Sequence, residues 1–164
     1  MEGKKQIERS TVIHAPVELV WEVLADSRLL PEWVPAVDKV TDCSIEGEAL
    51  GEVRHCNANL AGKPGRMVER CIEFTPMTRI AYVVDDESFG MRKMFDHYGF
   101  AINLKSDSPE TTHVTLETHD TPRNPMYGLL NKLMVRRQFE KVCEEIVVGL
   151  KTFTESRYLA PETG

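Results

Sequence analysis

The amino-acid sequence predicts an α+β fold in which a curved, seven-stranded antiparallel sheet wraps around one long C-terminal helix. Apolar residues recur at helical spacing over residues 126–153, and they follow a series of strand-like segments separated by short turns. A helix of roughly 30 residues is about 45 Å long, whereas a compact chain of this length has a radius of gyration of about 15 Å. The helix must therefore cross nearly the whole molecule. A sheet curved around it leaves a gap that we expect to be a ligand cavity.

The N-terminal part of the sequence predicts one strand followed by two short helices. Residues 6–13 are rich in β-branched side chains, which favours a strand. Pro16 suits the first position of a helix and Glu18 suits the positive end of the helix dipole, so residues 16–25 predict a helix. Residues 27–33 predict a second short helix, which ends where Pro35 restricts the preceding residue.

Six further strands are expected between these helices and the long helix. They cover residues 38–45, 51–60, 66–74, 79–84, 93–104 and 112–121. Turn residues separate them at intervals of 10 to 15 residues. Such short connections join antiparallel neighbours, so the sequence predicts a meander.

The apolar stripe of the long helix changes side along its length. In the second half, one face carries Phe139, Val142, Cys143, Ile146, Leu150 and Phe153, and this face should pack on the sheet. In the first half, a straight helix would turn the apolar side chains the other way: Met126, Leu129, Leu130, Leu133 and Met134. A bend near residues 135–138 explains the change, as in long helices that wrap around cores. Alternatively, the apolar side chains of the first half have a partner of their own, which could be a bound ligand, a second subunit in a homodimer, or a membrane surface.

Composition restricts the class of protein. The chain has 164 residues, enough for one domain with its own core over residues 1–164. The formal net charge of −6 argues against nucleic-acid binding. The four cysteines have neither disulfide-framework nor metal-ligand spacing, so we expect reduced thiols in a cytoplasmic protein. Residues 1–10 lack a signal-peptide core and no run is long enough for a transmembrane segment.

Four stretches resemble a known superfamily. They are residues 10–21 (STVIHAPVELVW), 26–35 (DSRLLPEWVP), 69–82 (from Glu69-Arg70 through Phe74-Thr75-Pro76 to Arg79-Ile80-Ala81-Tyr82) and 127–137 (from Tyr127-Gly128 to Arg136-Arg137). Together they resemble the START-related (SRPBCC) superfamily of polyketide cyclases, lipid-transfer domains and birch-pollen allergens. The resemblance implies a helix-grip fold with an apolar cavity. It implies binding of lipids, sterols, quinones, polyketides or plant hormones, cyclisation or dehydration in a minority of members, and no cofactor.

Residues 94–100 combine aromatic and ionisable side chains. If Phe100 and Ile102 face the interior, strand alternation places Tyr98 and Asp96 on the same face. A buried Asp96 and the Tyr98 hydroxyl could then form a catalytic acid–base pair. The alternative, which we favour, places Asp96 at the solvated rim of the sheet.

Arg70 is a third candidate catalytic residue. The apolar side chains of Val68, Ile72 and Phe74 favour the buried side of the strand for Arg70 rather than for Glu69. A buried arginine needs a carboxylate partner, which Asp96 or a ligand anion could supply.

Candidate ligand-binding residues fall into three groups. Aromatic side chains near the cavity mouth and on the sheet suit an apolar ligand, with core packing as the alternative: Trp33, Tyr82, Tyr98 and Phe100. The long helix contributes Leu130, Leu133 and Met134. A polar row that includes His55 and Asn57 could orient a ligand carbonyl or hydroxyl, or it could be a solvated strand face, which we favour.

No metal site is expected. His113 and His119 share one face of the last predicted strand with Glu117, but an extended strand separates such residues too far for one ion. We expect these histidines to face solvent.

These observations favour a carrier or sensor of a hydrophobic small molecule. Two alternatives remain. One is a polyketide cyclase or dehydrase that uses an acid–base pair in the cavity. The other is a protein-interaction module, similar to co-chaperone domains, that presents residues 126–134.

Overall fold

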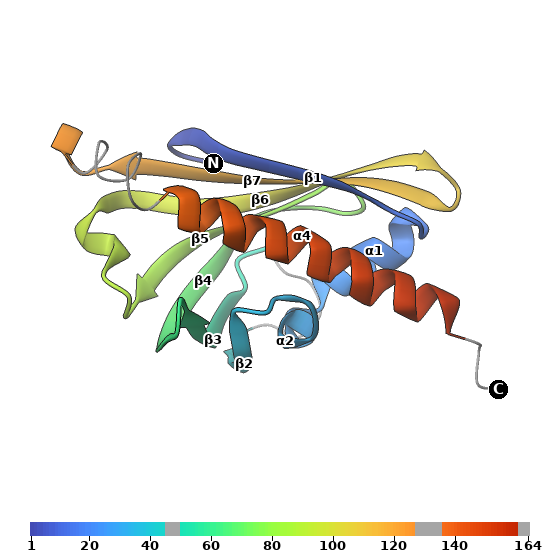
Figure 1. Ribbon diagram of the computed structural model, residues 1–164, viewed down its shortest axis with the longest axis horizontal. Coiled ribbons are helices and arrows are strands. Elements are labelled where there is room, and N and C mark those ends of the chain that lie inside the picture. The colour runs from blue at the N-terminus through green and yellow to red at the C-terminus, as the bar shows by residue number, and fades with distance from the viewer. Residues whose placement is uncertain (45–49, 127–135, 161–164) are drawn as a thin grey trace.

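The structure is a computed structural model that describes residues 1–44, 50–126 and 136–160 (Figure 1). Its elements follow the predicted order. In chain order they are β1 (Lys4–Ile13), α1 (Val17–Ala25), the 3₁₀ turn η1 (Ser27–Leu29), α2 (Leu30–Trp33), β2 (Val37–Cys43), β3 (Val53–Leu60), β4 (Lys63–Thr75), β5 (Arg79–Glu87), the 3₁₀ turn η2 (Met91–Lys93), β6 (Phe95–Ser108), β7 (Thr111–Pro122) and α4 (Arg136–Leu159).

Within the described residues the strands form one seven-stranded antiparallel sheet in the order β1-β7-β6-β5-β4-β3-β2. Each strand from β2 to β7 pairs with its neighbour in sequence, and β1 closes the series by pairing with β7. The sheet curves around α4, and α1 and α2 also contact α4 (Figure 1). The predicted fold is therefore confirmed.

The β3–β4 turn shows how the sequence sets the register of a hairpin. Ala61 and Gly62 connect the two strands, and both have positive φ, 53° and 80°. Two-residue hairpins of type I′ need positive φ at both central residues, because only that backbone matches the twist of the flanking strands.

Two β-bulges reverse the alternation of side chains within long strands. In β4 an extra residue, Ile72, lies between Cys71 and Glu73, which pair with consecutive residues of β5. In β6 the extra residue is Asp96, between Phe95 and His97. A bulge sets two residues against one on the partner strand, so side chains on either side of it exchange faces.

The short helices cover one end of the sheet. Helix α1 buries Val20, Val23 and Leu24. The second predicted helix divides into η1, whose first turn is capped by the Asp26 side chain accepting from the backbone N–H of Arg28, and α2.

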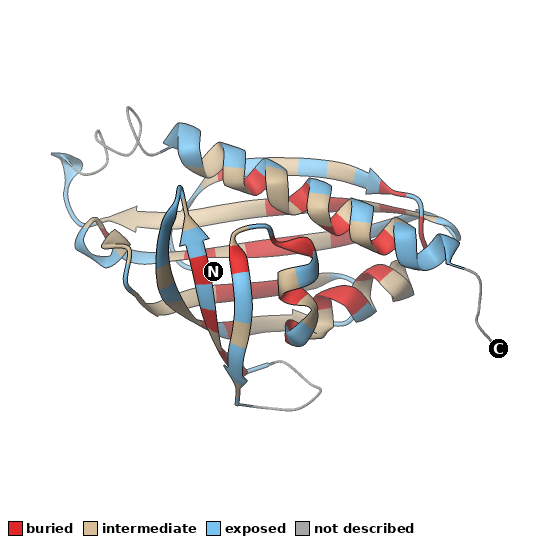
Figure 2. Cartoon of the chain, turned by 60° about the horizontal axis from the view of Figure 1, so that its bottom comes forward, coloured by how far each residue is buried: buried red, intermediate tan, exposed pale blue. Residues whose placement is uncertain are grey.

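Helix α4 packs on the sheet through the predicted face. Its 24 residues span about 36 Å. The buried side chains include Cys143, Val147, Leu150 and Thr154, and Figure 2 shows buried residues gathered along the strands and the long helix that crosses them. The predicted apolar residues Leu129, Leu130, Leu133 and Met134 lie outside the described residues. No helix in the described part of the chain is both long enough and apolar enough to cross a membrane.

Candidate functional site

An apolar cavity of about 170 Å³ lies between the sheet and the helices. The sheet supplies Phe100 and Ile102 from β6 and Leu116 from β7, and α4 supplies Val142 and Ile146. These side chains alternate with outward-facing residues on the strands and recur at i, i+4 on the helix, so the local geometry of each element turns them toward one interior. The predicted cavity is therefore present.

A buried ion pair forms one part of the cavity wall. The Arg54 Nε donates a hydrogen bond of 2.8 Å to Oε2 of Glu69, and each residue is only 3% exposed. The guanidinium also lies 3.8 Å from the ring centroid of Tyr82, which adds a cation–π contact. Burial acts to lower the pKa of Arg54, but Glu69, together with Tyr82 and Cys56, raises that pKa above its ordinary value. Arg54 is therefore a permanent cation.

A second buried carboxylate, Glu52, lies behind this pair. Its Oε2 accepts hydrogen bonds from the Ser27 hydroxyl at 2.9 Å and from the Tyr82 hydroxyl at 3.1 Å. Nη1 of Arg54 lies 3.4 Å from the same Ser27 hydroxyl, so this hydroxyl links Arg54 to Glu52. Burial raises the pKa of Tyr82, with a partial offset from Arg54, and the phenol remains a hydrogen-bond donor at neutral pH.

The loop between β5 and β6 reaches the cavity through Met91. One carboxylate holds this loop in place, because Glu87 accepts hydrogen bonds from the backbone N–H groups of Phe89, Gly90 and Arg92. Carboxylates that accept several backbone N–H groups form strong, charge-assisted hydrogen bonds. The loop therefore has a defined conformation beside the cavity.

Three of the predicted aromatic residues line the cavity: Trp33, Tyr98 and Phe100. Tyr82, the fourth, is fully buried and does not line the cavity. Its ring is stacked on that of Phe100 at a centroid distance of 5.7 Å. The predicted residues Leu130, Leu133 and Met134 lie outside the described part of the chain.

Asp96 does not pair with Tyr98 and lies exposed, as the favoured alternative held. Its carboxylate lies 3.1 Å from the guanidinium of Arg123. The bulge at Asp96 explains why the inward alternation ends there, because it turns Phe95 and Tyr98 inward and leaves Asp96 outside.

The prediction of a buried Arg70 is also wrong. Arg70 is exposed and forms a two-bond ion pair with Asp85, at 2.7 and 2.9 Å. The neighbouring Glu69 is the buried residue. The prediction counted alternation back from Phe74 across the bulge at Ile72, which reverses the faces.

His55 and Asn57 do not face the cavity. Asn57 is exposed and His55 half-buried, while the alternate residues Arg54 and Ala58 of the same strand are buried and line the cavity. The polar row is therefore the outer face of β3, as the favoured alternative held.

The sequence reasoning missed Arg54, Glu69 and Glu52. A signal for Arg54 existed, because it shares its strand face with Cys56 and Ala58, and a charged side chain on an apolar face implies a buried partner. For Glu69 the signal was concealed by the bulge in the same strand.

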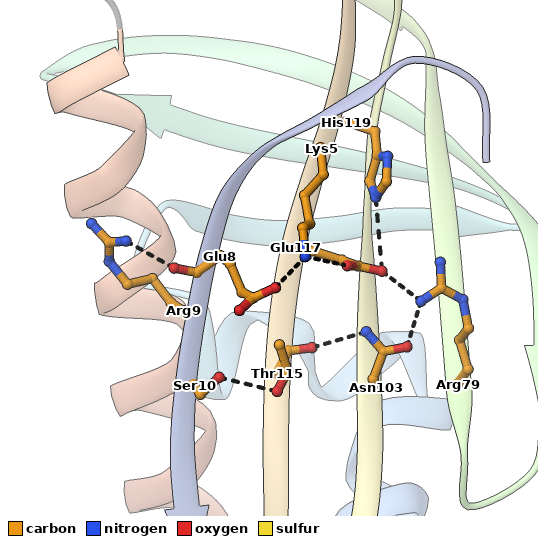
Figure 3. Close-up of polar contacts among 9 residues, drawn as sticks. All are labelled: Lys5, Glu8, Arg9, Ser10, Arg79, Asn103, Thr115, Glu117 and His119. Atoms are coloured by element: carbon orange, nitrogen blue, oxygen red, sulfur yellow. Dashed lines mark hydrogen bonds and ion pairs between the residues drawn. The ribbon is translucent and has the colours of Figure 1, made fainter.

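The opposite face of the sheet carries a second polar network, in which His119 is mostly buried, with its side chain 15% exposed, so the prediction that it faces solvent is wrong. Figure 3 shows it extending over β5, β6, β7 and β1. Glu117 is at its centre, with Oε1 2.6 Å from Arg79 Nη1 and 3.7 Å from His119 Nε2, and with Oε2 3.9 Å from Lys5 Nζ. Asn103 also bonds to Arg79. Burial acts to raise the pKa of Glu117, but the hydrogen bonds from Arg79 and Asn103 outweigh it and lower that pKa.

Glu117 gives the chain an expected pH dependence of stability. A carboxyl whose pKa is lowered in the folded state stabilises that state above its ordinary pKa of 4.5, and the contribution is lost as the pH falls through the folded value. Glu117→Gln should therefore cost about 1–3 kcal/mol at pH 7, and the difference from the unaltered chain should shrink below about pH 4.5. Urea unfolding at pH 7, 5 and 3.5 measures it. Glu8→Gln is the control. It removes an exposed ion pair with Lys5, which water screens, and should leave the free energy of unfolding unchanged at each pH. If the variant and the unaltered chain differ in free energy of unfolding by the same amount at all three pH values, the lowered pKa assigned to Glu117 is contradicted.

The geometry defines a class of protein: a helix-grip fold with an apolar cavity between the sheet and its C-terminal helix. Residues 4–155 match the family described as polyketide cyclase / dehydrase and lipid transport, and the chain belongs to that family. No curated protein matches the sequence significantly.

Solved structures share the fold at low sequence identity. The Zhui aromatase/cyclase from Streptomyces sp. R1128 is similar with a TM-score of 0.78 and 21% identity, over 97% of this chain and 99% of that chain. A START superfamily protein from Mycobacterium smegmatis has a TM-score of 0.74 and 13% identity, over 94% and 99%. The di-domain aromatase/cyclase BexL from the BE-7585A biosynthetic pathway has a TM-score of 0.75 and 18% identity, over 94% of this chain and 47% of that chain.

Proposed function

We propose that the protein binds a hydrophobic small molecule in the cavity between the sheet and α4, as a carrier or sensor. The observation that carries this proposal is the apolar cavity of about 170 Å³ whose wall includes one buried, internally paired ion pair, Arg54–Glu69. A wall of this kind offers a ligand apolar contact without demanding a charge from it.

The size of the cavity sets the scale of the ligand. An engineered apolar cavity of about 150 Å³ binds benzene, so this cavity suits a molecule of one or two fused rings. We propose that Trp33, Tyr98 and Phe100 contact the ligand, since aromatic rings in a cavity wall supply large apolar faces. The prediction that Leu130, Leu133 and Met134 contact the ligand is not tested by the described residues.

Native mass spectrometry and thermal unfolding test this function. Freshly purified protein should carry a bound mass, or a panel of ring compounds should raise its Tm. A ligand at one hundred times its Kd adds about 2.7 kcal/mol, which corresponds to roughly 5–10 °C for a chain of this size. Neither a bound mass nor a shift with any lipid, quinone or polyketide-like compound would contradict the proposal.

A pair of variants on one helix provides the control. Val142→Phe fills the cavity and should abolish the Tm shift, because Val142 lines the wall. Val148→Phe adds the same ring to an exposed position of α4, 49% exposed, and should leave the shift unchanged.

A second candidate is a cyclase or dehydrase acting on a polyketide-like substrate in the same cavity. The observation that favours it is the presence of Arg54 and the Tyr98 hydroxyl in one apolar wall, where a cation and a hydroxyl can polarise a carbonyl group. Mass spectrometry of a poly-ketone incubated with the protein distinguishes the two functions. An enzyme should release water from the compound, whereas a carrier should leave it unchanged.

We further propose that residues 1–164 form a single ligand-binding domain in the reducing cytoplasm, with no nucleic-acid partner. The cysteines are free thiols, and burial raises the pKa of Cys56 to about 12 and of Cys143 to about 11, which suits thiols that remain reduced. The negative net charge supports the absence of nucleic acid. A homodimer and an interaction module stay predictions, because most of the segment that suggested them lies outside the described residues.

A further inference from the structure

Among the cavity-lining residues, Trp33 and Tyr98 each carry a buried hydrogen-bonding group without a hydrogen-bond partner in the described part of the chain: the indole Nε1 and the phenol hydroxyl. The ring nitrogens of His119, which are also buried without a hydrogen bond among the described residues, lie beside Glu117 in the network described above, with Nε2 at 3.7 Å. Trp33 and Tyr98 both line the cavity, and Trp33 is only 5% exposed. A buried polar group that stays unpaired costs the folded state about 1–3 kcal/mol, so each group favours an occupant that can pair with it.

The two groups come from different walls. Trp33 belongs to α2, which contacts β2 and α4, whereas Tyr98 belongs to β6, toward the other edge of the sheet order. An indole N–H can only donate, and a phenol can donate or accept. Burial, with smaller effects from the carboxylates of Glu87 and Glu69, raises the pKa of Tyr98, so its hydroxyl keeps its proton at neutral pH. Trp33 and Tyr98 therefore offer hydrogen-bond donors from separate walls of the cavity.

The charges in the wall favour a neutral occupant. Arg54 is held by Glu69 at 2.8 Å, and Arg136, at the start of α4, lies 3.0 Å from Glu140. A ligand carboxylate would have to compete with these pairs, and it would lie near the buried charge of Glu69. A neutral oxygen acceptor meets no such competition.

We propose that the ligand is a neutral, flat, fused-ring ketone or ring ether with acceptor oxygens at separated positions, and that Trp33 and Tyr98 determine this specificity. The inference rests on the proposed function and deepens it. A ring system fits the volume and the aromatic wall, and its oxygens restore the hydrogen bonds that the two donors lack. A plain acyl chain offers no acceptor along its length.

Calorimetric titration with matched probes tests the inference. Chromone has two oxygens on opposite sides of one ring, both acceptors, and naphthalene has the same two-ring outline without them. The unaltered protein should bind chromone about ten-fold more tightly than naphthalene and more tightly than decanoate. Tyr98→Phe and Trp33→Phe should each weaken chromone binding about five- to ten-fold, leave naphthalene within about two-fold, and together remove the preference.

Naphthalene binding reports that each variant retains a folded cavity. Trp21→Phe is the matched control, because Trp21 packs on Phe74 and does not line the cavity among the described residues. It should leave both affinities unchanged. Equal affinity for chromone and naphthalene, tighter binding of decanoate, or an equal loss of both ring probes in the variants would overturn this inference and leave the proposed function intact. Failure of every probe to bind the unaltered protein would overturn both.

Discussion

Glu69→Gln is expected to lower the free energy of unfolding by about 3–5 kcal/mol. The change leaves the guanidinium of Arg54 buried, 3% exposed, without its carboxylate partner. Glu52 is not a direct partner of Arg54: its Oε2 accepts from the hydroxyls of Ser27 and Tyr82. Among the described residues Arg54 forms its ion pair with Glu69. Urea unfolding at pH 7 measures the loss.

The neighbouring residue provides a matched control. Arg70, next in the same strand, forms an exposed two-bond pair with Asp85. Asp85→Asn should cost under about 1 kcal/mol, because exposed ion pairs are screened by water. Arg54→Met combined with Glu69→Leu should recover most of the stability, since replacing both buried charges by apolar side chains removes the unpaired charge. A loss of under 1 kcal/mol for Glu69→Gln would contradict a buried ion pair.

Gly149→Ala is expected to destabilise the chain by about 1–3 kcal/mol, although alanine is the better helix former by about 1 kcal/mol. A Cβ at position 149 of α4 would lie 2.1 Å from the backbone carbonyl oxygen of Trp33. Because the obstacle is backbone, α2 must move away from α4. The change should also weaken ligand binding, since Trp33 forms part of the cavity wall.

Thr152→Ala is the control for this substitution. Thr152 is exposed on the same helix, so the change should show the helix-propensity gain alone, a few tenths of a kcal/mol. Thermal unfolding of the two variants side by side measures both effects. Stabilisation by Gly149→Ala would mean that α2 and α4 do not meet as closely as described.

The fold could be predicted because its signals are regular over many residues. Helical spacing in the second half of α4 and turn residues between strands each repeat a simple pattern, and the meander follows from short connections. The Ala61-Gly62 turn shows the same local control of register.

The site could be predicted only where a strand is regular. Phe100 and Trp33 line the cavity as expected, but Asp96 and Arg70 face solvent. The solvated Asp96 agrees with the favoured alternative, whereas the prediction of a buried Arg70 is wrong. In both strands a single inserted residue, Asp96 itself or Ile72, reverses the alternation on which an inward placement depends. Sequence periodicity carries no clear signal for such an insertion, because one residue out of phase in a strand resembles ordinary variation.

The hollow interior links the lifetime of this protein to the ligand that we propose for it. On the scale measured for cavities in T4 lysozyme, an unfilled space of about 170 Å³ reduces stability by about 4 kcal/mol. That amount is comparable with the whole margin that keeps many natural chains folded. In a cell, where proteases remove chains that open, the steady-state amount of protein should rise with the supply of the molecule that fills the space.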